Sequence, residues 1–216
     1  MTGKRKKLSP EELLCLNSIL GGDSIHGIHL AAPILIEEQE YVTNTEKKMI
    51  AHGLSDTEHR LTAEGRLYLR ILKDYKSCSV HLTIGAVSLG LLEDNLCVYI
   101  QKEGYGYRLF YCHTGLILTG LLKEYPYLAQ GQNKDQRRHF LLNEVDGKQE
   151  IKADIELKKY ENGVLVLHES IWQDEDRLYL QDCRKSSVTC MGARDIRVHL
   201  WNILEIMIES DKRRLG

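Results

Sequence analysis

The first 75 residues carry apolar side chains at helical spacing, in three segments separated by turn residues. Ser9, Pro10 and Glu12 form the signature of a capping box at the start of the first helix, which we expect to end at Gly21 and Gly22. We predict a second helix from residue 33 to residue 52 and a third that begins after Thr62. Their predicted inward side chains are Leu13, Leu14, Leu16, Ile19 and Leu20 in the first; Ile36, Tyr41, Met49 and Ile50 in the second; and Leu67, Leu69, Ile71, Leu72 and Tyr75 in the third.

The apolar period changes from helical to alternating after Tyr75. In residues 80–84, the pattern predicts a half-buried strand with Val80, Leu82 and Ile84 inward and His81 and Thr83 outward. Residues 96–101 and 107–112 flank the sequence KEGYG, which predicts a β-hairpin. A loop centred between Gly104 and Tyr105 would place Cys97 opposite Cys112, whereas a slip of one residue would separate them.

The second half repeats part of this pattern. A helical or mixed segment near 116–128 is followed by the polar stretch AQGQNKDQRR, which we interpret as a linker. Residues 151–159 and 164–171 predict a second hairpin around Asn162-Gly163, and 178–183 and 187–191 predict further strands. We expect a last helix over 196–208, with its apolar side formed by Trp201, Leu204, Met207 and Ile208.

This order of elements predicts an α+β fold in which helical bundles flank a central antiparallel sheet. We expect residues 1–216 to form a single two-lobed domain. Its first lobe, 1–130, has helices and then the hairpin sheet; its second lobe, 131–216, has the second hairpin, short strands and the C-terminal helix. The reversed order of helices and hairpin suggests a pseudo-two-fold relation between the halves, which no sequence identity supports.

Composition and charge indicate an ordered protein without a nucleic-acid-binding surface. Lys and Arg number 29 against 31 Asp and Glu, and the net charge is -2, whereas phosphate binding requires a basic face. The basic runs at 4–7 and 212–214 are the exceptions. The sequence has no apolar stretch typical of a signal peptide or membrane span, and its six cysteines show no C-x-x-C spacing. These features favour a cytoplasmic protein with reduced thiols.

Motifs for enzymatic chemistry are incomplete. The spacing of Gly115 and Gly120 resembles a phosphate-binding loop, but Leu121 and Leu122 replace the required Lys and Ser or Thr. Ser88 lacks one glycine of a nucleophile elbow, and His26-x-x-His29 lacks a third metal ligand. We therefore expect no enzyme activity, no catalytic residues, no metal and no cofactor. A hydrolase site built from two distant acids stays open as an alternative.

The sequence LTAEG at 61–65 raises a further alternative, because an LT-x-x-G turn that opens an amphipathic helix is found in winged-helix regulators. Three helices and a two-stranded wing can be drawn over 9–112. The third helix, however, offers Glu64 and Asp74 beside its basic residues, and the apolar run 80–92 precedes the wing. We interpret LT-x-x-G as a helix cap with a closely packed glycine, and keep a DNA-binding regulator as the alternative function.

Two long stretches are similar to the EspG-like secretion-associated chaperones of type VII (ESX) systems. The first is "VHLTIGAVSLGLLEDNLCVYIQKEGYGYRLFYC", which follows the segments "ELLCL" and "AHGL" and the helix after Thr62. The second is "ENGVLVLHESIWQDEDRLYLQDCRKSSVTCMGARDIRVHLWNIL" near the C-terminus. The resemblance lies in element order more than in motifs. It implies a cytoplasmic, non-enzymatic chaperone or adaptor whose partners are secreted helical hairpins or toxins, with no small-molecule substrate and no membrane insertion.

The resemblance also implies a partner-binding site. Members of that family contact their clients partly through a protruding hairpin loop, which corresponds here to Lys102, Gly104, Tyr105, Gly106 and Tyr107. The two tyrosines are suitable anchors, because a tyrosine offers a large contact area and a hydrogen-bonding tip at low entropic cost. The alternative is that both tyrosines only cover the hairpin.

Overall fold

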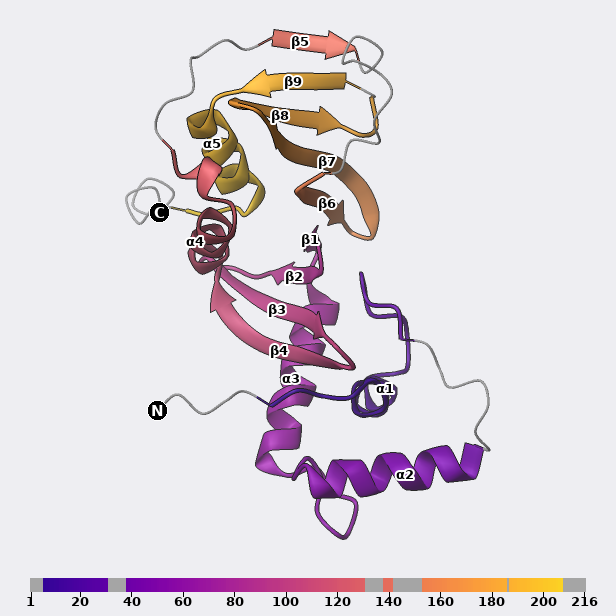
Figure 1. The fold of residues 1–216 in the computed structure, drawn as a ribbon. Helices are drawn as coiled ribbons and strands as arrows, with labels where there is room; N and C mark the ends of the chain where they lie inside the picture. Colours follow the sequence, from indigo (N-terminus) through magenta and orange to yellow (C-terminus); the bar gives the residue numbers. More distant parts are fainter. Residues whose placement is uncertain (1–5, 31–37, 131–137, 142–152, 186, 208–216) are drawn as a thin grey trace. The chain divides into compact units, whose positions relative to one another are not determined.

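The computed structural model describes residues 6–30, 38–130, 138–141, 153–185 and 187–207 (Figure 1). It confirms an α+β fold with a central antiparallel sheet. The helices are α1 Pro10–Ile19, α2 Glu38–Ala51, α3 Ala63–Ser77, α4 Thr114–Glu124, η1 Pro126–Leu128 and α5 Ala193–Ile203. The strands are β1 Val80–Ile84, β2 Val87–Leu91, β3 Leu96–Glu103, β4 Gly106–His113, β5 Arg138–Leu141, β6 Ile155–Glu161, β7 Val164–Asp174, β8 Arg177–Asp182 and β9 Ser187–Met191.

The strands are ordered β4-β3-β2-β1-β6-β7-β8-β9-β5. The chain divides into two compact units that alternate along the sequence. Unit 1 comprises Met1–Cys78, Ala86–Gly90 and Val98–Tyr111, and unit 2 comprises Ser79–Gly85, Leu91–Cys97 and Cys112–Gly216. The predicted single two-lobed domain and its pseudo-two-fold relation stay predictions.

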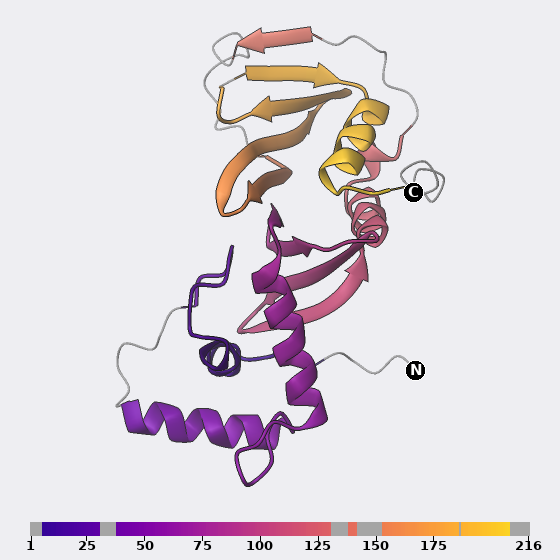
Figure 2. The same ribbon diagram turned by 180° about the vertical axis from the view of Figure 1, so that it is seen from behind.

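Unit 1 is built on the three predicted helices. The capping box of α1 is formed as predicted, since the Ser9 N–H donates to Glu12 Oε2 over 2.7 Å and the Glu12 N–H donates to Ser9 Oγ over 3.3 Å. Gly53 follows α2 with a φ of +66°. Helix α3 runs along one face of the part of the sheet formed by β2–β4 (Figure 2). The helix lies close to Gly90 of β2, where an added Cβ would lie 2.9 Å from Tyr75 Cδ2.

The inward faces of these helices differ from the prediction at two positions. Leu67 is 51% exposed and Ile19 is 53% exposed, although both were expected inside. Tyr68 takes the inward position on α3 instead, and it is buried. Leu13, Leu16, Met49, Ile71, Leu72 and Tyr75 are buried as predicted. Ile36 and the side chain of Tyr41 lie outside the described residues.

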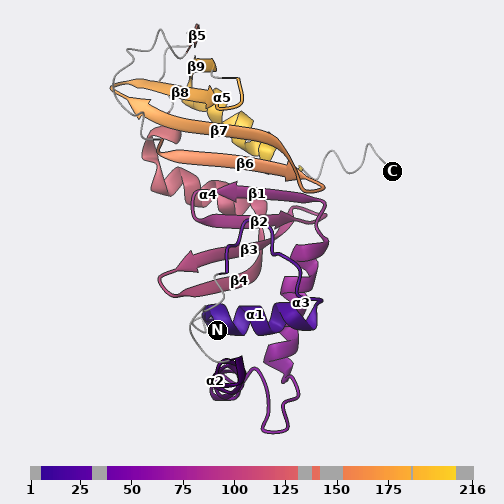
Figure 3. The ribbon, with the colours of Figure 1, turned by 90° about the vertical axis from the view of Figure 1, so that its right-hand side faces the viewer.

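Unit 2 is an antiparallel array in which β1 pairs with β6, β6 with β7, β7 with β8, β8 with β9, and β9 with β5. The predicted turn at Asn162-Gly163 is confirmed, with φ values of +50° and +80° that fit a type I′ hairpin. Helix α5 covers one face of these strands (Figure 3), and His199 on α5 contacts Glu169 on β7 with an Nε2–Oε2 distance of 2.6 Å.

Three predictions for unit 2 need correction. His81 was expected to point to solvent, but it is buried. Helix α5 spans 193–203 instead of 196–208, because the chain leaves the helix at Leu204 and Glu205 takes a left-handed φ of +53°. The buried side chains near this end are Ile196, Leu200, Ile203 and Leu204, whereas Trp201 and Met207 are 37% and 45% exposed. Ile208 and most of the predicted linker lie outside the described residues.

Candidate functional site

The predicted partner-binding loop is the tight turn between β3 and β4. The strands end at Glu103 and resume at Gly106, which leaves Gly104 and Tyr105 as a two-residue loop. Gly104 has a φ of +60°, a conformation that favours glycine. The register centred on this loop places Tyr99 opposite Phe110, and their rings stack with centroids 4.5 Å apart. The predicted loop centre is therefore confirmed.

The two tyrosines of the loop have different environments. Tyr105 is 97% exposed at the tip of the turn, whereas Tyr107 is only 4% exposed. The backbone of Tyr107 accepts from the Leu8 N–H over 2.8 Å and donates to the Leu8 carbonyl over 2.7 Å. Burial also raises the pKa of the Tyr107 phenol. Tyr107 is thus part of the framework of the hairpin, and Tyr105 is the side chain that a partner can reach.

The remaining predicted residues divide in the same way. Lys102 and Gly104 are exposed beside Tyr105, whereas Gly106 is buried under the N-terminal segment. A Cβ at Gly106 would lie 3.0 Å from the Leu8 carbonyl oxygen. The surface that the hairpin offers therefore consists of Lys102, Gly104 and Tyr105, and we call it the hairpin tip.

An ionic cluster fixes the base of the hairpin tip. Glu103 Oε2 lies 2.7 Å from Lys7 Nζ and 3.1 Å from Arg108 Nη2. The hydrogen bond from Lys7 lowers the pKa of the Glu103 carboxyl, partial burial opposes this shift, and the charges of Arg108 and Lys7 add to it. The cluster holds the N-terminal segment and both strands together just behind Tyr105.

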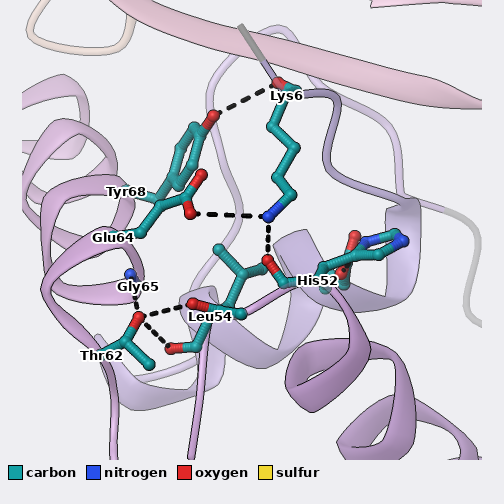
Figure 4. A network of polar contacts seen from close by, with 9 residues as sticks. Lys6, His52, Leu54, Thr62, Glu64, Gly65 and Tyr68 are labelled. Carbon is teal, nitrogen blue, oxygen red and sulfur yellow. Dashed lines mark hydrogen bonds and ion pairs between the residues drawn. The ribbon is translucent and has the colours of Figure 1, made fainter.

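The start of α3 explains the LT-x-x-G sequence. The Thr62 hydroxyl accepts from the Gly65 N–H over 3.1 Å and donates to the Gly53 carbonyl over 2.6 Å, as Figure 4 shows for the network around this cap. A Cβ on Gly65 would lie 2.0 Å from the Leu54 carbonyl oxygen, so only glycine fits. The interpretation as a cap with a closely packed glycine is confirmed.

The same network holds one of the basic residues of the N-terminal run. Lys6 Nζ donates to the His52 carbonyl and lies 3.5 Å from Glu64 Oε2, while the Tyr68 hydroxyl donates to the Lys6 carbonyl over 3.3 Å (Figure 4). Lys6 therefore holds the N-terminal segment against α2 and α3. Lys7 also has a partner in Glu103, so both residues of the basic run 4–7 that the structure describes make intramolecular contacts.

A contact that the sequence did not reveal joins α1 to the end of α2. Glu12 is fully buried, and its Oε1 lies 2.6 Å from His52 Nδ1, while its Oε2 accepts from the Ser9 N–H. The carboxylate thus has a partner on each oxygen, which suits a structural role. The "AHGL" segment marked the end of the helix but carried no sign of this pairing, because the two residues lie far apart in sequence.

Unit 2 contains a cavity of about 450 Å³. Its wall is formed by the turn between β2 and β3 and by the end of α5, with lining residues that include Leu92, Glu93, Asp94, Asn95, Trp201 and Glu205. Asp94, Asn95 and Glu205 all have left-handed backbone conformations, with φ values of +60°, +59° and +53°. Trp201, predicted on the apolar side of the last helix, lines this cavity and is 37% exposed.

Two of the lining residues, Asn95 and Met207, are joined by a pair of hydrogen bonds. The Asn95 side-chain amide donates to the Met207 carbonyl over 2.8 Å and its Oδ1 accepts from the Met207 N–H over 2.6 Å. Glu205 is held by Lys159, with an Oε1–Nζ distance of 2.8 Å.

Two residues of the incomplete motifs, Ser88 and His26, lie in the part of the chain that the structure describes. Ser88 is buried in β2, and the His26 carbonyl accepts a 2.7 Å hydrogen bond from the Tyr75 hydroxyl. Within the described ranges, no group of three or more His, Cys, Asp and Glu side chains is arranged to hold a metal ion. None of the helices in these ranges has the length and hydropathy needed to cross a bilayer.

A family model described as "Domain of unknown function (DUF5081)" matches residues 2–188. No curated protein matches the sequence.

Proposed function

We propose that this chain, which belongs to the DUF5081 family, a domain of unknown function, binds other proteins. The proposal rests on its geometry and on its resemblance to known chaperones. Its role is that of a cytoplasmic, non-enzymatic chaperone or adaptor for secreted substrates of a type VII (ESX-like) secretion system. The clients are helical hairpins or larger toxins of the same system. The proposal requires no cofactor and no small-molecule substrate.

The observation that carries this proposal is the environment of Tyr105. An aromatic side chain with 97% exposure costs more to hydrate than a polar one and is available to a partner without rearrangement. Its backbone is held by a two-residue turn, and the Glu103 cluster fixes the strands behind it. A partner therefore loses little conformational entropy from this side of the interface when it covers the ring.

The division between Tyr105 and Tyr107 also supports a binding role for the tip. If both tyrosines only covered the hairpin, both would lie against the sheet. Tyr107 does so, but Tyr105 does not. Lys102 beside it adds a positive charge at the rim, which would favour clients with acidic residues near their apolar contact.

The test is co-expression of the full chain with helical-hairpin substrates encoded beside it, followed by size exclusion and affinity measurement. We expect at least one stable complex, in which Tyr105→Ala weakens binding by about 30-fold, the effect of losing a central aromatic anchor. Leu116→Ala is the control, since Leu116 is a 62% exposed apolar side chain on α4. If Tyr105→Ala and Leu116→Ala have equal effects on binding, the hairpin tip is not the binding site. If the protein forms a complex with none of the substrates, the chaperone role is wrong.

A second candidate function, DNA binding by the N-terminal half, has one observation in its favour. Arg66, Arg70 and Lys73 are exposed and lie at helical spacing along one side of α3. Against it, Lys6 and Lys7 make contacts within the protein, and Arg66 Nη1 donates to the Leu61 carbonyl over 2.6 Å. The exposed basic set is thus small for a phosphate-binding face.

An electrophoretic shift with duplex DNA at two salt concentrations decides this alternative. A regulator would give a salt-sensitive shift that Arg70→Gln combined with Lys73→Gln abolishes, while Lys102→Gln, a change of the same kind on the hairpin tip, leaves it intact. We expect no shift below micromolar concentrations in any of these variants.

A further inference from the structure

The base of the hairpin brings two thiols together. Cys97 on β3 and Cys112 on β4 have their Sγ atoms 3.4 Å apart, and the Cys97 thiol also lies 3.4 Å from the Cys112 carbonyl oxygen. This is the pairing that the loop centre predicts, with the same register as Tyr99 and Phe110. Opposed residues of antiparallel strands have Cα atoms about 4.5–5.5 Å apart, within the range that a disulfide can span.

We propose that Cys97 and Cys112 form a reversible dithiol–disulfide pair, with a low-molecular-weight disulfide as the oxidant. The proposal is independent of the chaperone function. It concerns a modification site at the base of the hairpin, and it rests on the proximity and the unequal exposure of the two sulfurs.

Exposure sets the order of events. Cys97 is fully buried, whereas Cys112 is partly exposed. A small disulfide in solution therefore reaches Cys112 first. Since the Cys97 sulfur already lies 3.4 Å from that of Cys112, it can displace the small thiol without movement of the strands.

The exchange balances in two steps. The Cys112 thiolate attacks one sulfur of the small disulfide, its S–S bond breaks, and one small thiol leaves while Cys112 is held in a mixed disulfide. The Cys97 thiolate then attacks the Cys112 sulfur and expels the second small thiol. Two protein thiols are oxidised and one small disulfide is reduced, and the two protons released by the cysteines end on the two small thiols.

Two of the other thiols, Cys78 and Cys15, are less suited to this exchange. Burial raises the pKa of Cys78 to about 11, and the charge of Asp74 adds to this shift. Burial also raises the pKa of Cys15, with further contributions from Glu46 and Glu12. A smaller thiolate fraction makes both poorer nucleophiles. Cys183 lies 3.4 Å from the hydroxyl of Ser170.

Oxidation would close the stretch of chain from 97 to 112, which includes the whole β3–β4 turn and Tyr105. The two strands could then no longer separate at their base. We expect slower amide exchange in β3 and β4 of the oxidised protein, and the exchange rates should return to their original values after reduction.

The experiment uses the full chain in buffers of reduced and oxidised glutathione, followed by acid quenching, alkylation and peptide mapping. The expected result is the loss of two alkylatable thiols per chain, recovery of a cross-linked Cys97–Cys112 peptide, and reversal by dithiothreitol. Cys97→Ser should instead accumulate glutathione on Cys112, because the resolving thiol is gone. Cys112→Ser should leave Cys97 unmodified, and Cys183→Ser should behave like the original protein.

Two results would overturn the pair. One is a Cys112–glutathione adduct that persists in the unsubstituted protein while Cys97 stays alkylatable; the other is a cross-link of either residue to a different cysteine. If Cys97→Ser does not fold because the site is buried, Cys97→Ala replaces it, and the peptide map of the unsubstituted protein decides the question by itself.

Discussion

At the scale of single residues, Gly65 shows how one position can determine the packing of the segments around it. A glycine within a helix usually lowers stability, because it loses more conformational entropy on folding than an alanine would. Here the backbone of Leu54 passes so close to the first turn of α3 that a methyl group has no room. Thr62 then completes the contact by bridging the Gly65 N–H and the Gly53 carbonyl.

We therefore expect Gly65→Ala to destabilise the protein by about 2–3 kcal/mol, the upper part of the range for overpacking a well-packed site. The matched control is Gly120→Ala within α4, where nothing lies within 4 Å of the added Cβ. That change should stabilise by about 0.5–1 kcal/mol. Urea unfolding of both variants checks the prediction, and equal signs for the two changes would contradict the close packing at Gly65.

At the scale of elements, turn chemistry was the most reliable guide. Asn162-Gly163 and Gly104-Tyr105 both lie where the sequence placed them, because two-residue hairpin loops demand residues that tolerate unusual φ values. The same arithmetic located the Cys97–Cys112 pair. The capping box of α1 was equally local and equally readable.

The faces of the helices were harder to predict, because an apolar side chain does not reveal what lies opposite it. Leu67 is exposed and Tyr68 is buried, since tyrosine can bury its ring and still donate from its hydroxyl to the Lys6 carbonyl. Trp201 and Met207 line a cavity wall because α5 ends at 203. Strand β5 was missed, since its four residues follow a polar stretch. For the candidate site, the sequence predicted the loop but could not distinguish the exposed Tyr105 from the buried Tyr107, whose backbone pairs with the distant Leu8.

The ionic cluster behind the hairpin predicts a dependence on pH. Because Lys7 lowers the pKa of Glu103 below its ordinary value of 4.5, the folded state favours the ionised carboxyl. Its contribution to stability is complete above pH 4.5 and is lost as the pH falls through the lowered pKa. Glu103→Gln should reduce stability at neutral pH and flatten the loss of stability between about pH 5 and pH 3.

Denaturant titrations at several pH values measure this effect. Glu58→Gln serves as the comparison, because Glu58 is a 69% exposed carboxylate in the turn before α3. A pH profile of Glu103→Gln that coincides with that of the original protein would show that the cluster contributes nothing to the hairpin.

At the scale of the whole molecule, the two compact units are not successive in the sequence. Strand β1 lies early in the chain, but its ladder partner β6 lies beyond residue 154, and five residue pairs join them. Leu82 and Ile84 of β1 are buried. A chain that stops at residue 130 would keep β1 and lose β6, and so would present a bare apolar strand edge.

We expect a fragment of residues 1–130 to self-associate, and light scattering coupled to size exclusion should show species larger than a monomer. The control is the full chain with a protease site inserted in the polar stretch 129–138. After cleavage its two pieces should stay together, because cutting the polar stretch leaves the β1–β6 ladder intact. A monomeric fragment 1–130 as stable as the full chain would contradict this account.

The pairing of Leu8 with Tyr107 matters for anyone who shortens or tags this protein. Those two backbone hydrogen bonds lie on the edge of β4 next to the hairpin tip. Leu8 therefore protects this edge from pairing with strands of neighbouring molecules. Starting the chain at Ser9 would remove the Leu8–Tyr107 pairing, and a bulky globular tag fused directly before Leu8 would disrupt it. Such preparations should aggregate through the exposed edge of β4, and the loss of the basic residues is not the cause.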